Sequence, residues 1–195
     1  VPPLLKKPAP CRLTFAVGGA GASKEIGAEI LEGISPLLER EEFDLTLIAG
    51  TRKEVAEYWK RNIRELGLTR FLGRGVRIVL AKTREKAFEQ FEETLEKTDI
   101  LWTKPSELSF YAALGIPIIM APPIGSQEVQ NRKWLLYVGA GLEQLSPKIC
   151  WQWLSDFVAK GIFAEAAMQG FAEIEKEGAK NIGNMVLQAT SNHKR

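Results

Sequence analysis

Two patterns of hydrophobic residues alternate along the chain, one typical of β-strands and one typical of α-helices. Short, nearly continuous apolar runs, typical of strands buried on both faces, precede longer segments in which apolar residues recur every three or four positions, the spacing of an amphipathic helix. The predicted strands lie at 12–17, 43–49, 75–81, 99–103 and 116–121, with a short sixth strand at 142–145. Because a helical segment follows each strand, the pattern predicts an α/β fold: a doubly wound, Rossmann-like parallel sheet of five or six strands, with helices on both faces.

The helical periodicity extends to the C-terminal region and suggests how the chain is divided. Predicted helices cover 24–40, 52–67, the stretch marked by Phe88, Phe91 and Leu95, the stretch opened by Pro105, the stretch from Val129 to Val138, 150–159, and a long C-terminal helix at 162–189. The proline-rich residues 1–10 are expected to form an extended linker. Residues 11–160 then form the Rossmann-like domain, and residues 161–195 a C-terminal helical extension and tail.

Composition narrows the functional classes. The 195 residues carry a formal charge of only +2, with basic and acidic residues interleaved, so we expect no nucleic-acid partner. The single histidine, His193, stands three residues from the end, which argues against a histidine base, a Ser-His-Asp triad or a histidine-ligated metal. We expect no metal and no cofactor.

Cysteine usage and hydropathy indicate the compartment. Cys11 and Cys150 fit neither a disulfide framework nor a zinc spacing, and we expect both to be reduced and structural. No apolar run approaches the ~18 residues of a membrane-spanning helix. The sequence therefore predicts a cytoplasmic protein.

A glycine-rich turn, "GGAGAS", follows the first predicted strand, where doubly wound sheets bind ligands. It lacks the Gly-Lys-Ser/Thr of a Walker A loop, and Lys24 stands where a dinucleotide fingerprint requires glycine or alanine. The second strand ends "AGTR", without the acid that would hold a ribose of NAD. A helix N-terminus contributes about 0.3–1 kcal/mol to a nearby anion, whereas micromolar binding needs roughly 8 kcal/mol, so further loops must converge on the same edge.

Two further loops could form a ligand site together with this turn. A helix starting at Pro105 would leave the amides of Ser106, Glu107 and Leu108 as unpaired donors. The next loop, "APPIGSQEVQN", offers the polar side chains of Ser126, Gln127, Glu128 and Asn131 at another helix start.

The segment 103–131, with "TK", "PSELSFYAALGIP", "IIMAPP" and "GSQEVQN", resembles the nucleotide-sugar half of the GT-B glycosyltransferases. It is most similar to monogalactosyldiacylglycerol synthase and to the bacterial N-acetylglucosaminyl transferase of peptidoglycan lipid synthesis. In the order of its elements the resemblance extends over about residues 11–180, and it is specific only in 103–131.

The resemblance implies the C-terminal, donor-binding half of a metal-independent glycosyltransferase that uses a UDP-sugar. An N-terminal domain would then supply the acceptor site, and peripheral membrane association through that missing half stays open. The residues implied to approach the diphosphate or the sugar-transfer site are Gly19, Ala20, Gly21, Ala22 and Ser23. Backbone atoms of Leu80 and Ala81 would meet the uracil edge, and Thr103, Lys104 and Ser106 would hold a phosphate. Gln127 and Glu128 would face the donor sugar or diphosphate.

Two departures from the family pattern leave alternatives open. Phe110 occupies the position of the glutamate that takes the ribose hydroxyls, and the phosphate loop is about two residues shorter and lacks glycine. Glu107 either replaces the lost carboxylate or only complements the helix dipole. The alternatives are a non-catalytic GT-B-like binding or interaction domain, and a nucleotide-sugar 2-epimerase relative, which would need more carboxylates at the strand ends.

The closing helix also permits two interpretations. Four apolar residues have helical spacing in its second half: Ile182, Met185, Val186 and Ala189. They would either dock on the missing half or cover this domain's own sheet.

Overall fold

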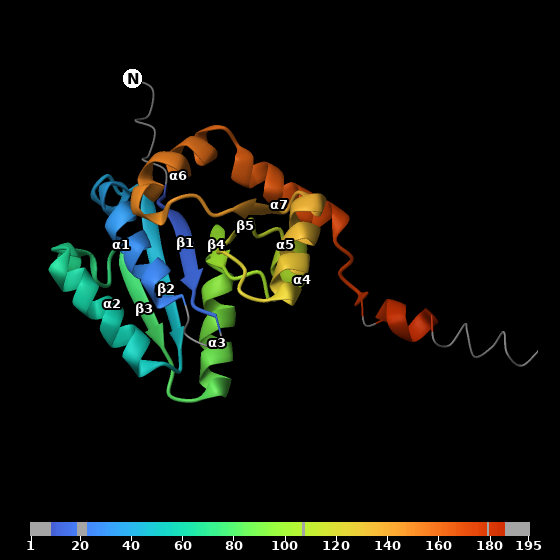
Figure 1. Ribbon diagram of the computed structural model, residues 1–195, viewed down its shortest axis with the longest axis horizontal. Helices are drawn as coiled ribbons and strands as arrows, with labels where there is room; N and C mark the ends of the chain where they lie inside the picture. The colour runs from blue at the N-terminus through green and yellow to red at the C-terminus, as the bar shows by residue number, and fades with distance from the viewer. Residues whose placement is uncertain (1–8, 19–22, 107, 179, 186–195) are drawn as a thin grey trace, which may run out of the picture.

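The computed structural model describes residues 9–18, 23–106, 108–178 and 180–185. In this part of the chain, six parallel strands form one sheet with the order β3-β2-β1-β4-β5-β6 (Figure 1). The strands are β1 (Cys11–Ala16), β2 (Phe43–Gly50), β3 (Val76–Leu80), β4 (Ile100–Thr103), β5 (Ile118–Met120) and β6 (Gly141–Glu143). This is the strand order of the Rossmann fold, and the predicted α/β, doubly wound class is confirmed.

Helices connect successive strands, as the alternating periodicity predicts. They are α1 (Lys24–Glu39), α2 (Lys53–Glu65), α3 (Arg84–Leu95), α4 (Leu108–Ala113), α5 (Ser126–Val138), α6 (Cys150–Ala159) and α7 (Ile162–Glu173), with short 3-10 turns at Leu68–Phe71 and Pro147–Ile149. None of the described helices is long and apolar enough to cross a membrane.

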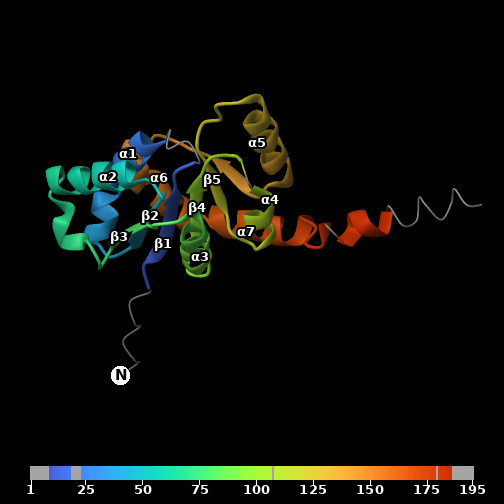
Figure 2. The same cartoon turned by 90° about the horizontal axis from the view of Figure 1, so that it is seen from below.

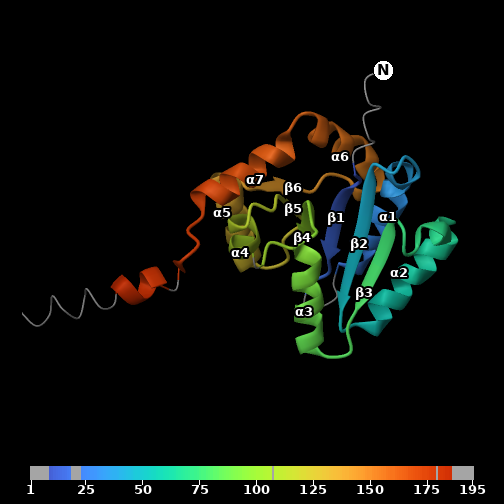
Figure 3. The same ribbon diagram turned by 180° about the vertical axis from the view of Figure 1, so that it is seen from behind.

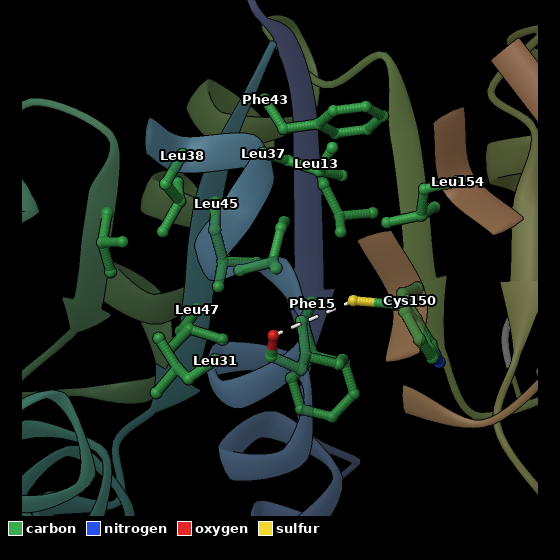
Figure 4. Close-up of a cluster of buried hydrophobic side chains, with 14 of the residues drawn as sticks. Leu13, Phe15, Leu31, Leu37, Leu38, Phe43, Leu45, Leu47, Cys150 and Leu154 are labelled. Carbon is green, nitrogen blue, oxygen red and sulfur yellow. Dashed lines mark hydrogen bonds between the residues drawn. The ribbon is translucent and has the colours of Figure 1, made fainter. Parts of the chain in front are cut away.

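The main hydrophobic core lies on the side of the sheet covered by α1, α2 and α6 (Figures 1 and 4). Leu13 and Phe15 of β1 alternate with residues that face the other side, and both are fully buried. Helix α1 meets them with Leu31, and α6 meets them with Cys150 and Leu154 (Figure 4). The core therefore joins the first third of the chain to its last third.

The opposite side of the sheet has smaller apolar clusters, one of them formed by β5 with α4 and α5. There Leu95 at the end of α3 packs with Leu101 of β4 and with Ile116 in a small separate cluster. Figure 3 shows α3 crossing this side near β1 and β4, where it leaves much of β2 and β3 uncovered. We call this side of the sheet the α3 side.

Two predicted helices differ from the structure. The helix expected from Pro105 begins only at Leu108 and has six residues. The continuous helix expected over 162–189 is interrupted, because α7 ends at Glu173 and Ile174 has an extended backbone with φ −95° and ψ 123°.

A further helical segment at 180–185 extends away from the sheet (Figure 2). Its residues Ile182 and Met185 are 65% and 71% exposed. These two side chains therefore do not cover the domain's own sheet. Val186 and Ala189 lie outside the described residues.

Both cysteines are free, as expected. Burial raises the pKa of the Cys150 thiol to about 12. Burial and the nearby Asp99 carboxylate raise the pKa of the half-buried Cys11 thiol to about 12, although Arg12 opposes this shift. Neither thiol is ionised near neutral pH, so both act as small apolar side chains.

Candidate functional site

The strand order places the expected ligand crevice between β1 and β4. Crossovers run outward from β1 in one direction and from β4 in the other, and in open α/β sheets ligands bind at such a switch point, outside the carboxyl ends of the strands. Phe15 is paired with Trp102, and the Thr103 hydroxyl lies 3.5 Å from the Ala16 carbonyl oxygen. The turn after β1 and the loop after β4 therefore leave the same edge side by side, as the sequence predicts.

Lys104 is the charged residue whose side chain lies between the turn after β1 and the loop after β4. The residue is only 8% exposed, and its side chain lies over Gly18: a Cβ atom added at Gly18 would be 2.8 Å from Lys104 Cδ. Within the described residues Lys104 makes no ion pair and no side-chain hydrogen bond. A buried charge without a partner is costly, so this position is suited to a bound anion. The same side chain fills part of the space between the two loops.

The loop after Lys104 does not form the predicted helix-terminal phosphate site. The Ser106 amide is not an unpaired donor, because it donates to the Lys104 carbonyl at 2.8 Å. Helix α4 starts two residues later and is too short for a substantial dipole. Glu107, with its two alternative roles, lies outside the described residues.

Asn131 of α5 holds this loop in place, a role that sequence reasoning missed. Its side-chain amide donates to the carbonyl oxygens of Pro105 and Ser106, both at 3.0 Å. Asn131 stands one helical turn after Gln127, so the helical spacing of "GSQEVQN" was the available signal. Gly18 was also missed as a position of close approach, although it directly precedes the predicted turn.

The start of α5 places its two predicted donor-sugar residues differently. Gln127 is exposed at the first turn. The Glu128 carboxylate instead accepts a hydrogen bond from the Ile124 amide at 2.8 Å, as in a capping box. Glu128 therefore serves its own helix, and Gln127 is the better placed of the two to meet a ligand.

The remaining predicted residues are only partly described. Ser23 is buried at the N-cap of α1 without a side-chain capping bond, while Gly19, Ala20, Gly21 and Ala22 lie outside the described residues. The Ala81 amide is engaged by the Gly50 carbonyl at 2.8 Å, so it is not available to a base edge. Leu80 ends β3, two strands and thus about 10 Å from β1.

Phe110 stands on α4, in keeping with the departure noted in the sequence. It is 62% exposed, and its ring packs edge-on against Tyr111 with centroids 5.7 Å apart. An exposed phenyl ring cannot accept hydrogen bonds from ribose hydroxyls.

The fold is shared with several solved structures. MurG of Acinetobacter baumannii matches with a TM-score of 0.66 and 13% identity, over 94% of this chain and 51% of that one. UDP-GlcNAc 2-epimerase from Neisseria meningitidis, bound to UDP-GlcNAc, matches with a TM-score of 0.61 and 13% identity, over 93% and 45%. MnaA of S. aureus, in a structure with UDP, matches with a TM-score of 0.64 and 12% identity, over 93% and 46%.

These matches define the class: the chain has the fold of the C-terminal domain of GT-B glycosyltransferases, shared with nucleotide-sugar 2-epimerases. At 12–13% identity the likeness is one of fold. The chain spans about half the length of these proteins. No curated protein matches the sequence. Residues 4–160 match the family described as "Domain of unknown function (DUF6938)", and the chain belongs to that family.

Proposed function

We propose that the chain binds the nucleoside diphosphate of a nucleotide sugar at the crevice between β1 and β4. The observation that carries this proposal is Lys104, a buried lysine without a described counter-charge over Gly18, at the switch point of a Rossmann sheet. A buried ammonium group forms a strong, charge-assisted hydrogen bond when it donates to a phosphate oxygen. Solved structures with the same fold were determined with UDP-GlcNAc and with UDP.

The proposed activity is that of the donor half of a metal-independent glycosyltransferase using a UDP-sugar. Lys104 and the N-terminus of α1, which follows the turn after β1, would offset the charge of the departing diphosphate. Gln127 at the start of α5 would contact the donor sugar. The acceptor site belongs, on this proposal, to a second domain, in keeping with the length of the structural relatives.

Two observations favour a second candidate, a non-catalytic domain that binds nucleotide weakly or binds another partner. The exposed ring of Phe110 replaces a carboxylate, and the Ser106 amide is already used within its loop. Both features reduce the number of donor contacts. Nucleotide affinity separates the two candidates, because the first requires roughly 8 kcal/mol of binding free energy for micromolar affinity.

The proposal can be tested by calorimetric titration with UDP and UDP-GlcNAc, with and without EDTA. We expect micromolar binding that EDTA leaves unchanged. Asn131→Ala should weaken binding about fivefold or more, because it frees the carbonyl groups of the loop after β4. Asn62→Ala is a matched control, since its side-chain amide donates to the Tyr58 carbonyl on the distant α2.

Three results would contradict the proposal. No binding at millimolar UDP would leave the non-catalytic candidate. Equal losses in the Asn131 and Asn62 variants would place nucleotide elsewhere or reflect stability alone. Complete loss of binding in EDTA would refute metal independence.

A further inference from the structure

A cavity lies at the opposite, amino-terminal edge of the sheet, on the α3 side. It has a volume of about 230 Å³ and lies between the first halves of β1, β2 and β3 and the C-terminal end of α3. Six polar residues that line it carry the argument: Thr14, Asp44, Thr46, Arg74, Arg77 and Lys97. None of them belongs to the crevice between β1 and β4.

The polar lining is unusual for this fold. Strands of a parallel sheet are normally covered on both faces and are correspondingly apolar. Here the positions that alternate with the buried Leu13 and Leu45 carry Thr14, Asp44 and Thr46, and Arg77 occupies the neighbouring position on β3. Helix α3 leaves much of β2 and β3 uncovered on this side (Figure 3), and these side chains line the cavity beside it.

The charges around the cavity are mostly positive. Arg12 also lines it but is already neutralised by Asp99, which accepts from its Nε at 3.0 Å and its Nη2 at 2.7 Å. Arg74, Arg77 and Lys97 make no ion pair within the described part of the chain; Arg77 reaches only a hydroxyl, that of Thr94, at 3.4 Å.

Asp44 supplies the opposing carboxylate. Burial raises its pKa, although Arg12 acts in the other direction. The lining thus offers three basic groups that make no ion pair within the described residues against one carboxylate, an excess of positive charge that suits an anion.

A polar groove of about 260 Å³ continues from this cavity along α3 and shares Arg77 and Lys97 with it. Glu93 and Gln90 line the groove, and the Gln90 Oε1 atom is buried without a hydrogen-bond donor in the structure. The Gln90 Oε1 atom is closed off from the groove, so Glu93 supplies the acceptor for a group rich in hydroxyls.

We infer that the cavity and its groove bind a small phosphorylated, hydroxyl-rich molecule of the sugar-phosphate class. The phosphate lies among Arg74, Arg77 and Lys97, and a hydroxyl group donates to Glu93. This site is separate from the crevice between β1 and β4, because the two lie at opposite ends of the parallel strands, and it does not depend on the function proposed for that crevice.

The test is a titration of the isotopically labelled protein by NMR with inorganic phosphate, glucose 6-phosphate and glucose. We expect amide shifts at Thr46 and Thr94 with both phosphates, tighter binding of glucose 6-phosphate, and no shift with glucose alone. Arg77→Gln and Lys97→Gln should each weaken binding about tenfold or more. Lys133→Gln, a change of an exposed lysine on α5, should leave binding unchanged.

The possible results of this titration distinguish binding in the proposed cavity from binding elsewhere. Shifts confined to residues around Lys104, with binding lost in Lys104→Met, would place phosphate in the other crevice and overturn the inference. Equal weakening by Lys133→Gln would reveal non-specific attraction and also overturn it. If a variant fails to fold, the shifts of Thr46 and Thr94 in the unmodified protein decide the matter, and their absence at millimolar ligand refutes the site.

Discussion

Replacing Lys104 with methionine should move stability and nucleotide affinity in opposite directions. The Lys104 side chain is buried over Gly18, where its Cδ lies 2.8 Å from the position of an added Cβ. Methionine has a similarly long, flexible apolar stem, so it can keep this packing while removing the charge. The substitution therefore isolates the ammonium group.

The expected magnitudes follow from the burial of Lys104 and from the absence of a counter-charge among the described residues. A hydrogen bond between a charged group and phosphate contributes about 1.5–3 kcal/mol, so affinity for UDP should fall about 10- to 150-fold. Without nucleotide, removing a buried charge that has no partner within the described residues should stabilise the fold by about 1 kcal/mol. For a domain of this size, that gain raises Tm by about 2–4 °C.

Two measurements check this pair of effects: urea unfolding without ligand and calorimetric titration with UDP. Lys133→Met, on the exposed side of α5, provides the control and should change neither quantity by more than about 0.5 kcal/mol. If Lys104→Met lowers stability by 1 kcal/mol or more while UDP affinity stays the same, the lysine is structural and the argument for an anion site fails.

Three further predictions concern the scaffold. Gly33→Ala should destabilise the protein by about 3 kcal/mol in urea unfolding, because the new Cβ would lie 2.1 Å from the Pro147 carbonyl oxygen; a loss below about 0.5 kcal/mol would mean that the 3-10 turn shifts freely. Burial raises the pKa of Asp99, but hydrogen bonds from Arg12 outweigh it and lower the net pKa. Arg12→Gln should therefore cost stability above about pH 4, by less than about 1 kcal/mol because both side chains are more than a third exposed. This cost should vanish as pH falls through the folded pKa, and a cost that persists at pH 2 would contradict the ion-pair origin. The Cys150 thiol, with its pKa raised to about 12 by burial, should react with an aromatic disulfide reagent at pH 8 only as fast as the protein unfolds; rapid reaction of the folded protein would show that the α6 packing opens locally.

The strands were predictable because each one is a short apolar run bounded by polar turns, and all six appear in the sheet. Their order places the loops after β1 and β4 together, so the location of the crevice followed from the alternation of strands and helices alone. What the periodicity could not supply was the exact start of α4. Pro105 is a good first helical residue, but in the structure the Pro105 and Ser106 carbonyl groups accept from the Asn131 amide and α4 spans Leu108–Ala113.

The roles of individual polar side chains were harder to predict, because they depend on neighbours distant in sequence. Glu128 looked like a ligand for the donor sugar, yet its carboxylate is used by the Ile124 amide. Gly18 gains its importance from Lys104, which follows β4 and is distant from Gly18 in the sequence. Such pairings arise from tertiary structure and leave no periodic signal in the chain.

The central position of β1 has a consequence for how quickly this protein reaches its native state. Its neighbour β4 is joined through Arg12 and Asp99, 87 residues apart, and α6 meets α1 where Cys150 approaches the Ile30 carbonyl, 120 residues away. Contacts of such long sequence separation require large loops to close before any stabilisation is gained, which places folding in the millisecond-to-second range. We expect the α1–α6 seam to assemble late, so that the incomplete sheet exposes apolar surface during refolding and aggregates at high protein concentration.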